Sequence, residues 1–210
     1  MTRLSFLVRK SAAFLRDSRA AAAAEFALII PVLLIAIIGT IDVGRYAWAV
    51  AMSEKATQIG ARWAVTTDMV ASGLYSYSFA TSGGVPAGTT VNSTLFPGIT
   101  CNVSGCTCAT GGNCSSFGTA ADSAAFNRLV TRMREINPDI TAANVVVTYA
   151  WSGLGFAGDP NGPDVAPLTT VSLRNMQFAP ATLLVFATNV NLPQFAYTLP
   201  MEDGSGTTSN

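Results

Sequence analysis

The sequence predicts an α+β protein in which a long N-terminal transmembrane helix continues into a small periplasmic domain with an antiparallel sheet and a second helix. An apolar stretch long enough to cross a bilayer comes first, in residues 20–41. Farther along the chain, apolar residues recur at helical spacing and then in alternation, which is typical of a helix followed by strands. Four clustered cysteines indicate that this second part is exported to an oxidising compartment.

The apolar stretch has the length of a membrane span. A helix rises about 1.5 Å per residue, so these 22 residues cover roughly 33 Å, and a hydrocarbon core is about 30 Å thick. The one charge in the stretch is Glu25, and a carboxylate in lipid usually has a partner or a function. Alternatively, Glu25 lies at headgroup depth, and the stretch alone does not decide between these interpretations. Pro31 is predicted to kink or loosen the helix.

Residues 1–20 are predicted to form a basic cytoplasmic leader. Residues 1–19 hold five basic residues and one acidic residue, a net charge of +4. The positive-inside rule therefore places this end in the cytoplasm and the C-terminal region in the periplasm, with the lipid bilayer between them.

The helix is predicted to continue beyond the membrane to about residue 66, because residues 42–65 contain no proline. Tyr46 and Trp48 fall where an aromatic belt meets the outer interface, so they are predicted to anchor the helix there. Apolar residues in steps of three or four make one predicted helical face, namely Trp48, Met52, Ala56, Ile59 and Trp63.

A loop-rich region with a cysteine cluster follows, in residues 72–117. An even number of exported cysteines favours two disulfides, but four cysteines allow three connectivities and the sequence does not choose among them. A zinc site is the alternative, and it is disfavoured because the C-x4-C-x-C-x5-C spacing has no C-x2-C pair and the chain has no histidine. The disulfide candidates are Cys101, Cys106, Cys108 and Cys114.

A second helix is predicted to begin at Asp122 or Ser123, either of which can cap it, and to end before Pro138. It is indicated by apolar residues at helical spacing, namely Phe126, Leu129, Val130, Met133 and Ile136. The arginines of this helix, Arg128, Arg132 and Arg134, are most simply interpreted as its solvent-exposed face.

After this helix the apolar period changes to two. Residues 145–151 and 170–174 alternate in this way, so we predict two strands joined by a long flexible loop rich in Gly and Pro. Weaker signals indicate short β-prone pieces at 75–79 and 89–96, a helix or strand at 181–190, and an edge strand at 195–201.

The predicted organisation has four parts. They are the leader (1–20), a transmembrane and extended amphipathic helix (21–66), a periplasmic α+β domain with a cysteine-rich loop (67–201), and a flexible polar tail (202–210).

Composition argues against catalysis. Without histidine there is no Ser-His or Cys-His pair. The acids of residues 71–210 are scattered singly through turns and helix ends, except for the pair Glu202-Asp203, which precedes the polar tail and is more simply solvated than catalytic. We therefore predict no catalytic residues, no metal and no cofactor. Nucleic acid is not an expected partner either, because no basic stripe is interleaved with aromatic residues.

Three segments of the sequence carry a resemblance to a known family. Residues 22–31 (AAAEFALIIP), 41–45 (IDVGR) and 60–62 (GAR) closely resemble the TadE-like minor pseudopilins of tight-adherence (Flp/Tad) pili, a type IV pilus system. The likeness is specific through about residue 66 and thins towards the C-terminus. The cysteine loop is not covered by it.

The resemblance implies processing and assembly roles for particular residues. A prepilin peptidase of the family cuts five residues before a Glu, which places the cut between Ala20 and Ala21 and Glu25 at position five of the mature chain. The family usually has Gly before the cut, whereas this chain has Ala20. The new ammonium at Ala21 would lie one helical turn from Glu25, and related pilins use this Glu against the N-terminus of a neighbouring subunit.

The resulting expectation is a non-enzymatic minor pseudopilin in the bacterial inner membrane that helps to prime or build an adhesive pilus. The implied partners are the peptidase, other pilins and pseudopilins, and the inner-membrane assembly platform. The alternative is a membrane-tethered periplasmic binding or adhesive module that does not enter a filament.

Overall fold

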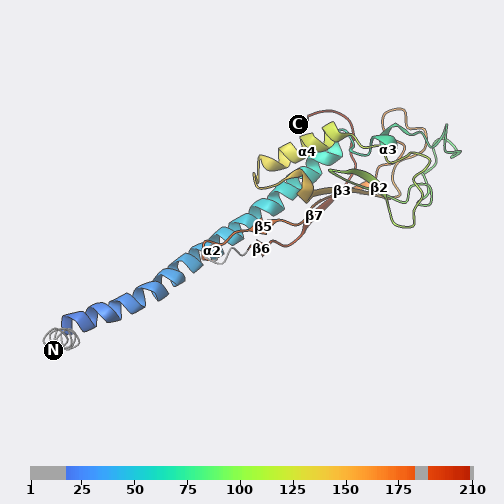
Figure 1. Cartoon of the computed structure of the whole chain (residues 1–210). Helices are drawn as coiled ribbons and strands as arrows, with labels where there is room; N and C mark the ends of the chain where they lie inside the picture. Colours follow the sequence, from blue (N-terminus) through green and yellow to red (C-terminus); the bar gives the residue numbers. More distant parts are fainter. Residues whose placement is uncertain (1–17, 183–188, 209–210) are drawn as a thin grey trace. The chain divides into compact units, whose positions relative to one another are not determined.

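A computed structural model describes residues 18–182 and 189–208 (Figure 1). The chain consists of two compact units. The helix unit contains the chain up to Ala47 together with Ala179–Val190. The sheet unit contains Trp48–Phe178 and Asn191–Asn210.

The first described element is a single long helix, α2, which runs from Ser18 to Thr66 with Pro31 inside it. It includes both the predicted span and the predicted extension, so the prediction of one long helix is confirmed. The predicted leader, residues 1–20, lies mostly outside the described residues.

The sheet unit is built on a five-stranded sheet in which every neighbouring pair is antiparallel. The strand order is β2-β1-β3-β4-β7, which confirms the predicted antiparallel sheet. Its strands are β1 (Ile99–Asn102), β2 (Gly105–Cys108), β3 (Val145–Ala150), β4 (Leu168–Leu173) and β7 (Phe195–Pro200). A separate two-stranded sheet pairs β5 (Gln177–Phe178) with β6 (Val190–Asn191).

One face of the sheet carries the core. Along β3 buried and half-buried residues alternate, and Val145, Val147 and Tyr149 are fully buried. The Tyr149 hydroxyl accepts a hydrogen bond of 3.0 Å from the backbone N–H of Val70, so its polar end is satisfied inside the core. Burial raises the pKa of Tyr149, and the phenol therefore stays protonated.

Helix α4 (Ser123–Arg134) is the predicted second helix. Asp122 caps it by accepting the N–H groups of Ala124 and Ala125 at 2.8 and 2.9 Å. Four of the five predicted apolar positions lie inside the helix and are buried, namely Phe126, Leu129, Val130 and Met133.

In the sheet unit, the buried face of α2 shares only Ala56 with the face that the sequence predicted. Trp48 is 69% exposed, and Ile59 and Trp63 are only half-buried. Apart from Val65 near the end of the helix, the buried residues form a stripe of small side chains, which are Ser53, Ala56, Thr57, Gly60, Ala61 and Ala64. Small side chains let a neighbouring element approach closely, and a Cβ on Gly60 would lie 2.8 Å from Met133 of α4.

Two weak strand predictions are wrong. Residues 72–76 form the short helix α3 (Ser72–Ser76), and residues 89–96 form turns, one of them closed by the Asn92 side chain on the N–H of Thr94. The actual partner strands, β1 and β2, follow directly and join at a short turn. A short 3-10 helix, η1 (Ala142–Asn144), precedes β3. The predicted element at 181–190 includes residues 183–188, which lie outside the described residues.

The described part of the C-terminal tail contacts the end of α2. The Val65 carbonyl accepts the N–H groups of residues 202–204 at 3.2 to 3.4 Å, and the Asp68 carboxylate accepts that of Gly206 at 2.7 Å. These bonds satisfy a carbonyl that has no partner within the helix. The predicted flexibility of the tail stays a prediction.

Candidate functional site

The membrane-spanning run is apolar on every side. In α2 the large side chains between Phe26 and Ile41 are exposed apart from the half-buried Ile30, with Leu28 reaching 76%. The run has a mean hydropathy of 2.6 over 18 residues and is scarcely covered by the rest of the chain. A helix that is apolar all round has a stable environment in lipid, so this helix makes the chain a single-pass membrane protein.

Glu25 lies in the N-terminal part of α2 and is exposed. The backbone at Ala20 and Ala21 is helical, and the side chains of both lie outside the described residues. The proposed cut between Ala20 and Ala21 and the assembly role of Glu25 therefore stay predictions.

The two aromatic residues predicted to anchor the helix differ in exposure. Trp48 projects from the helix surface, whereas Tyr46 is half-buried. An exposed indole just outside the span can lie at headgroup level, so the interfacial anchoring of both residues stays a prediction.

Asp42 is the first residue after the apolar run and belongs to the segment 41–45 that carries the family resemblance, but the sequence assigned it no role. The residue is 6% exposed, and its carboxylate accepts four hydrogen bonds. Three come from the far end of the sequence: the N–H of Ala181 at 2.9 Å, and the N–H and hydroxyl of Thr182 at 2.7 and 2.8 Å. The fourth is an ion pair with Arg45 at 2.9 Å.

These contacts favour the charged form of Asp42. The hydrogen bond from the Thr182 N–H is the largest cause, and together with the remaining donors it outweighs the opposing effect of burial. The pKa of Asp42 falls from 3.8 to about 2. An acid placed directly after an apolar run, with Arg three residues later, is the sequence signal that could have marked this cluster.

The structure gives the disulfide connectivity that the sequence left open. Cys101 is bonded to Cys106 and Cys108 to Cys114. The first bridge joins directly opposite residues of the β1–β2 hairpin, whose Cα atoms are 4.0 Å apart, and the second closes the loop after β2. The hairpin and the following loop are thereby tied to the edge of the sheet.

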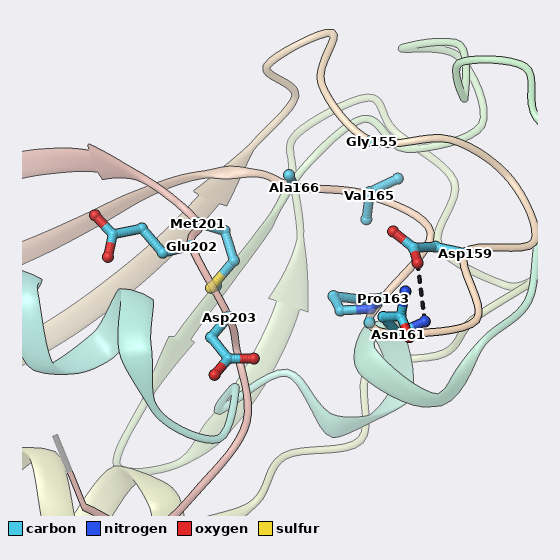
Figure 2. Close-up of a pocket in the computed structure, with 10 residues that line it drawn as sticks. Gly155, Asp159, Asn161, Pro163, Val165, Ala166, Met201, Glu202 and Asp203 are labelled. Carbon is cyan, nitrogen blue, oxygen red and sulfur yellow. Dashed lines mark hydrogen bonds between the residues drawn. The ribbon is translucent and has the colours of Figure 1, made fainter.

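A hollow with an acidic lining lies in the sheet unit (Figure 2). It has a volume of about 280 Å³. Glu202 and Asp203 line one side with Met201, and Asp159 and Asn161 line the other. Within the part of the chain that the structure describes, no three His, Cys, Asp or Glu side chains lie close enough together to hold a metal ion.

A second hollow, of about 240 Å³, lies between the end of α2 and helix α4. Arg128 and Arg132 line it, and the sequence had suggested that they form a solvated face. Arg128 instead pairs with Asp68 at 2.8 Å, and Arg132 pairs with Glu135 and lies 5.9 Å from the centre of the Trp63 ring. Each arginine therefore has an acidic partner within the protein, although the Arg128 Nε is buried and has no hydrogen-bond partner in the part of the chain that the structure describes.

The architecture defines a single-pass membrane protein with an α+β domain stapled by disulfides. Residues 20–62 match the family model described as TadE-like protein, which confirms the resemblance over that segment. Proteins of that family are involved in the Tad pilus system, associate with pilus components and are generally non-enzymatic. No curated protein and no solved structure matches the chain.

Proposed function

We propose that the chain is a minor pseudopilin that takes part in the assembly or priming of a tight-adherence, type IVb-like pilus and is not an enzyme. The observation that carries the proposal is the TadE-like match over residues 20–62, which covers the apolar run, Glu25 and the extension of α2. The domain of about 140 residues after the helix supports a minor or priming subunit rather than the bulk filament protein, because a main pilin needs little beyond the helix.

In this proposal the N-terminus is cytoplasmic and the sheet unit is periplasmic. The basic residues 1–19 support this orientation, and so do the two disulfides, which form in an oxidising compartment. The proposed partners are a prepilin peptidase, other pilins or pseudopilins, and the inner-membrane assembly platform.

Glu25 is the proposed assembly charge. In lipid its carboxylate needs a cation, and the ammonium of a processed neighbouring subunit would supply one while aligning the two helices. Glu25→Ala should leave the protein in the membrane and reduce its amount in sheared pili. A hydrogen bond to a charged group contributes about 1.5–3 kcal/mol, so we expect a reduction of roughly tenfold or more.

The matched control is Glu54→Ala, which removes an exposed acid of the same helix outside the apolar run. Immunoblots of sheared pili and of membranes measure both variants against the unaltered chain. Incorporation of Glu25→Ala at the unaltered level would remove the assembly role.

Processing between Ala20 and Ala21 is the second prediction of this function. The intact mass of the membrane-extracted protein should correspond to a chain that begins at Ala21. Ala20→Gly restores the residue usual in the family and should be processed at least as completely. A mass that still includes residues 1–20 in both chains would contradict the processing step.

The alternative function is a tethered periplasmic binding or adhesive module, for which the disulfide-stapled β1–β2 hairpin offers a rigid surface. The same fractionation separates the two functions. Presence in sheared pili favours the pseudopilin, and strict retention in the inner membrane favours the tethered module.

A further inference from the structure

Asp42 joins two parts of the chain that are far apart in sequence. The residues that donate to it from the C-terminal half, Ala181 and Thr182, are 139 and 140 positions away. We call residues 179–182 the strap. Both carboxylate oxygens of Asp42 take part, because Oδ1 accepts the Ala181 N–H and Oδ2 accepts the N–H and hydroxyl of Thr182. Consecutive N–H groups directed at one anion form a concave binding site for it.

The position of Asp42 places this contact at a defined depth. Asp42 directly follows the apolar run, which is long enough to cross the hydrocarbon core of about 30 Å. Its carboxylate therefore lies where hydrocarbon gives way to headgroups. At that depth an ionised group needs protein partners, and the strap and Arg45 provide them.

The composition of the strap suits the same depth. The strap contains no charged residue, and charges are absent from the whole of residues 175–201. An uncharged segment can lie among lipid headgroups without the cost of removing a charge from water. Within the strap, Ala179 is exposed and Thr182 is half-buried.

We propose that the strap is a second membrane-surface contact of this chain, held at lipid headgroup depth by the Asp42 carboxylate. Its partner is the headgroup region of the bilayer. The proposal depends on the single-pass membrane assignment and not on pilus assembly, so the failure of one does not imply the failure of the other. The lowered pKa of Asp42 supports it, since the ionised form is the one that holds the strap.

The test uses the full chain in vesicles of phosphatidylethanolamine and phosphatidylglycerol. The four native cysteines are paired in the structure, so Ala179→Cys introduces one reactive thiol for a nitroxide or an environment-sensitive fluorophore. Quenchers attached to lipid headgroups or dissolved in water then report the depth of the strap. A label at Val43→Cys, an exposed helix position, reports whether the helix itself has moved.

In the unaltered background, the label at position 179 should be quenched by headgroup quenchers and protected from aqueous ones. Asp42→Ala should reverse this preference and speed amide exchange at Ala181 and Thr182 roughly tenfold or more, because several hydrogen bonds to a charged group are lost together. Thr182→Val removes only the hydroxyl bond and should have a smaller effect. Glu54→Ala should have none.

Asp42→Asn provides a second variant if Asp42→Ala fails to insert, because it keeps one oxygen acceptor and loses the charge. The label at Val43→Cys should show the same quenching in every variant that inserts into the membrane. The proposal is overturned if the label at position 179 is open to aqueous quencher in the unaltered chain, or if neither Asp42 variant changes its depth or the amide exchange.

Discussion

Asp164 illustrates how much one residue can organise in this protein. The sequence suggested that it is a turn residue, yet it is 4% exposed and accepts the N–H groups of Phe79, Ala80 and Asp159 at 2.5, 3.4 and 3.2 Å. Two of these donors are more than 80 positions away in the sequence. The carboxylate therefore joins the loop after β3 to the segment after α3.

Asp164→Ala should lower the free energy of unfolding of the sheet unit by about 2–4 kcal/mol, because it leaves buried N–H groups without an acceptor. All three tryptophans belong to this unit, so their fluorescence during denaturation of the detergent-solubilised chain measures the change. The control is Asp139→Ala, which removes an exposed acid. An equal effect of the two substitutions would show that the Asp164 contacts contribute little.

Among the elements, α2 has two faces inside the sheet unit that differ in side-chain size and in burial. The sequence pattern pointed to a face made mostly of large apolar residues, but the buried residues are small apart from Val65, and Gly60 contacts Met133 of α4. Close approach of two helices requires the smallest side chains at the contact, so the volume of the partner decides which face is buried.

Gly60→Val should destabilise the sheet unit by about 1–3 kcal/mol, because the added side chain would overlap Met133. Met133→Ala alone should also destabilise it, through a cavity. Combined, the two substitutions should cost less than the sum of the single costs, since the space vacated by Met133 accepts the valine. Additive costs in tryptophan-detected denaturation would contradict this contact.

For the whole molecule, the disulfides stabilise the fold of the sheet unit, whereas the apolar run holds the chain in the membrane. Each bridge closes a short loop in the sheet unit, with a sequence separation of 5 or 6. The loop-entropy relation gives about 2 kcal/mol for a loop of that length. The apolar run is held by lipid and does not depend on either bridge.

Replacing Cys101 and Cys106 together by Ala, or Cys108 and Cys114 together, should therefore lower the stability of the sheet unit by about 2 kcal/mol per bridge. Resistance of the protein to alkaline extraction from membranes should not change. Variants in which only one cysteine of a pair is replaced are the informative comparison. They lose the same bridge and also keep a free thiol, so they should lower the stability of the sheet unit at least as much as the paired variants. Loss of membrane association in the paired variants would contradict this independence.

The sequence by itself determined the parts whose physics is local. The length and polarity of residues 20–41 predicted a span, helical spacing and a capping Asp122 predicted α4, and alternation predicted β3 and β4. Each depends on residues a few positions apart, so the pattern is legible along the chain. The resemblance to TadE-like proteins likewise rests on contiguous residues around Glu25.

Only the tertiary structure decided which distant groups meet. The pairing of the cysteines, the strap held by Asp42, the segment held by Asp164 and the small-residue face of α2 all depend on how the folded chain brings remote segments together. An acid at the end of an apolar run or in a Gly-rich loop looks the same in sequence whether water or a backbone amide satisfies it. Burial separates the two cases, because an acid removed from water must find its donors in the protein.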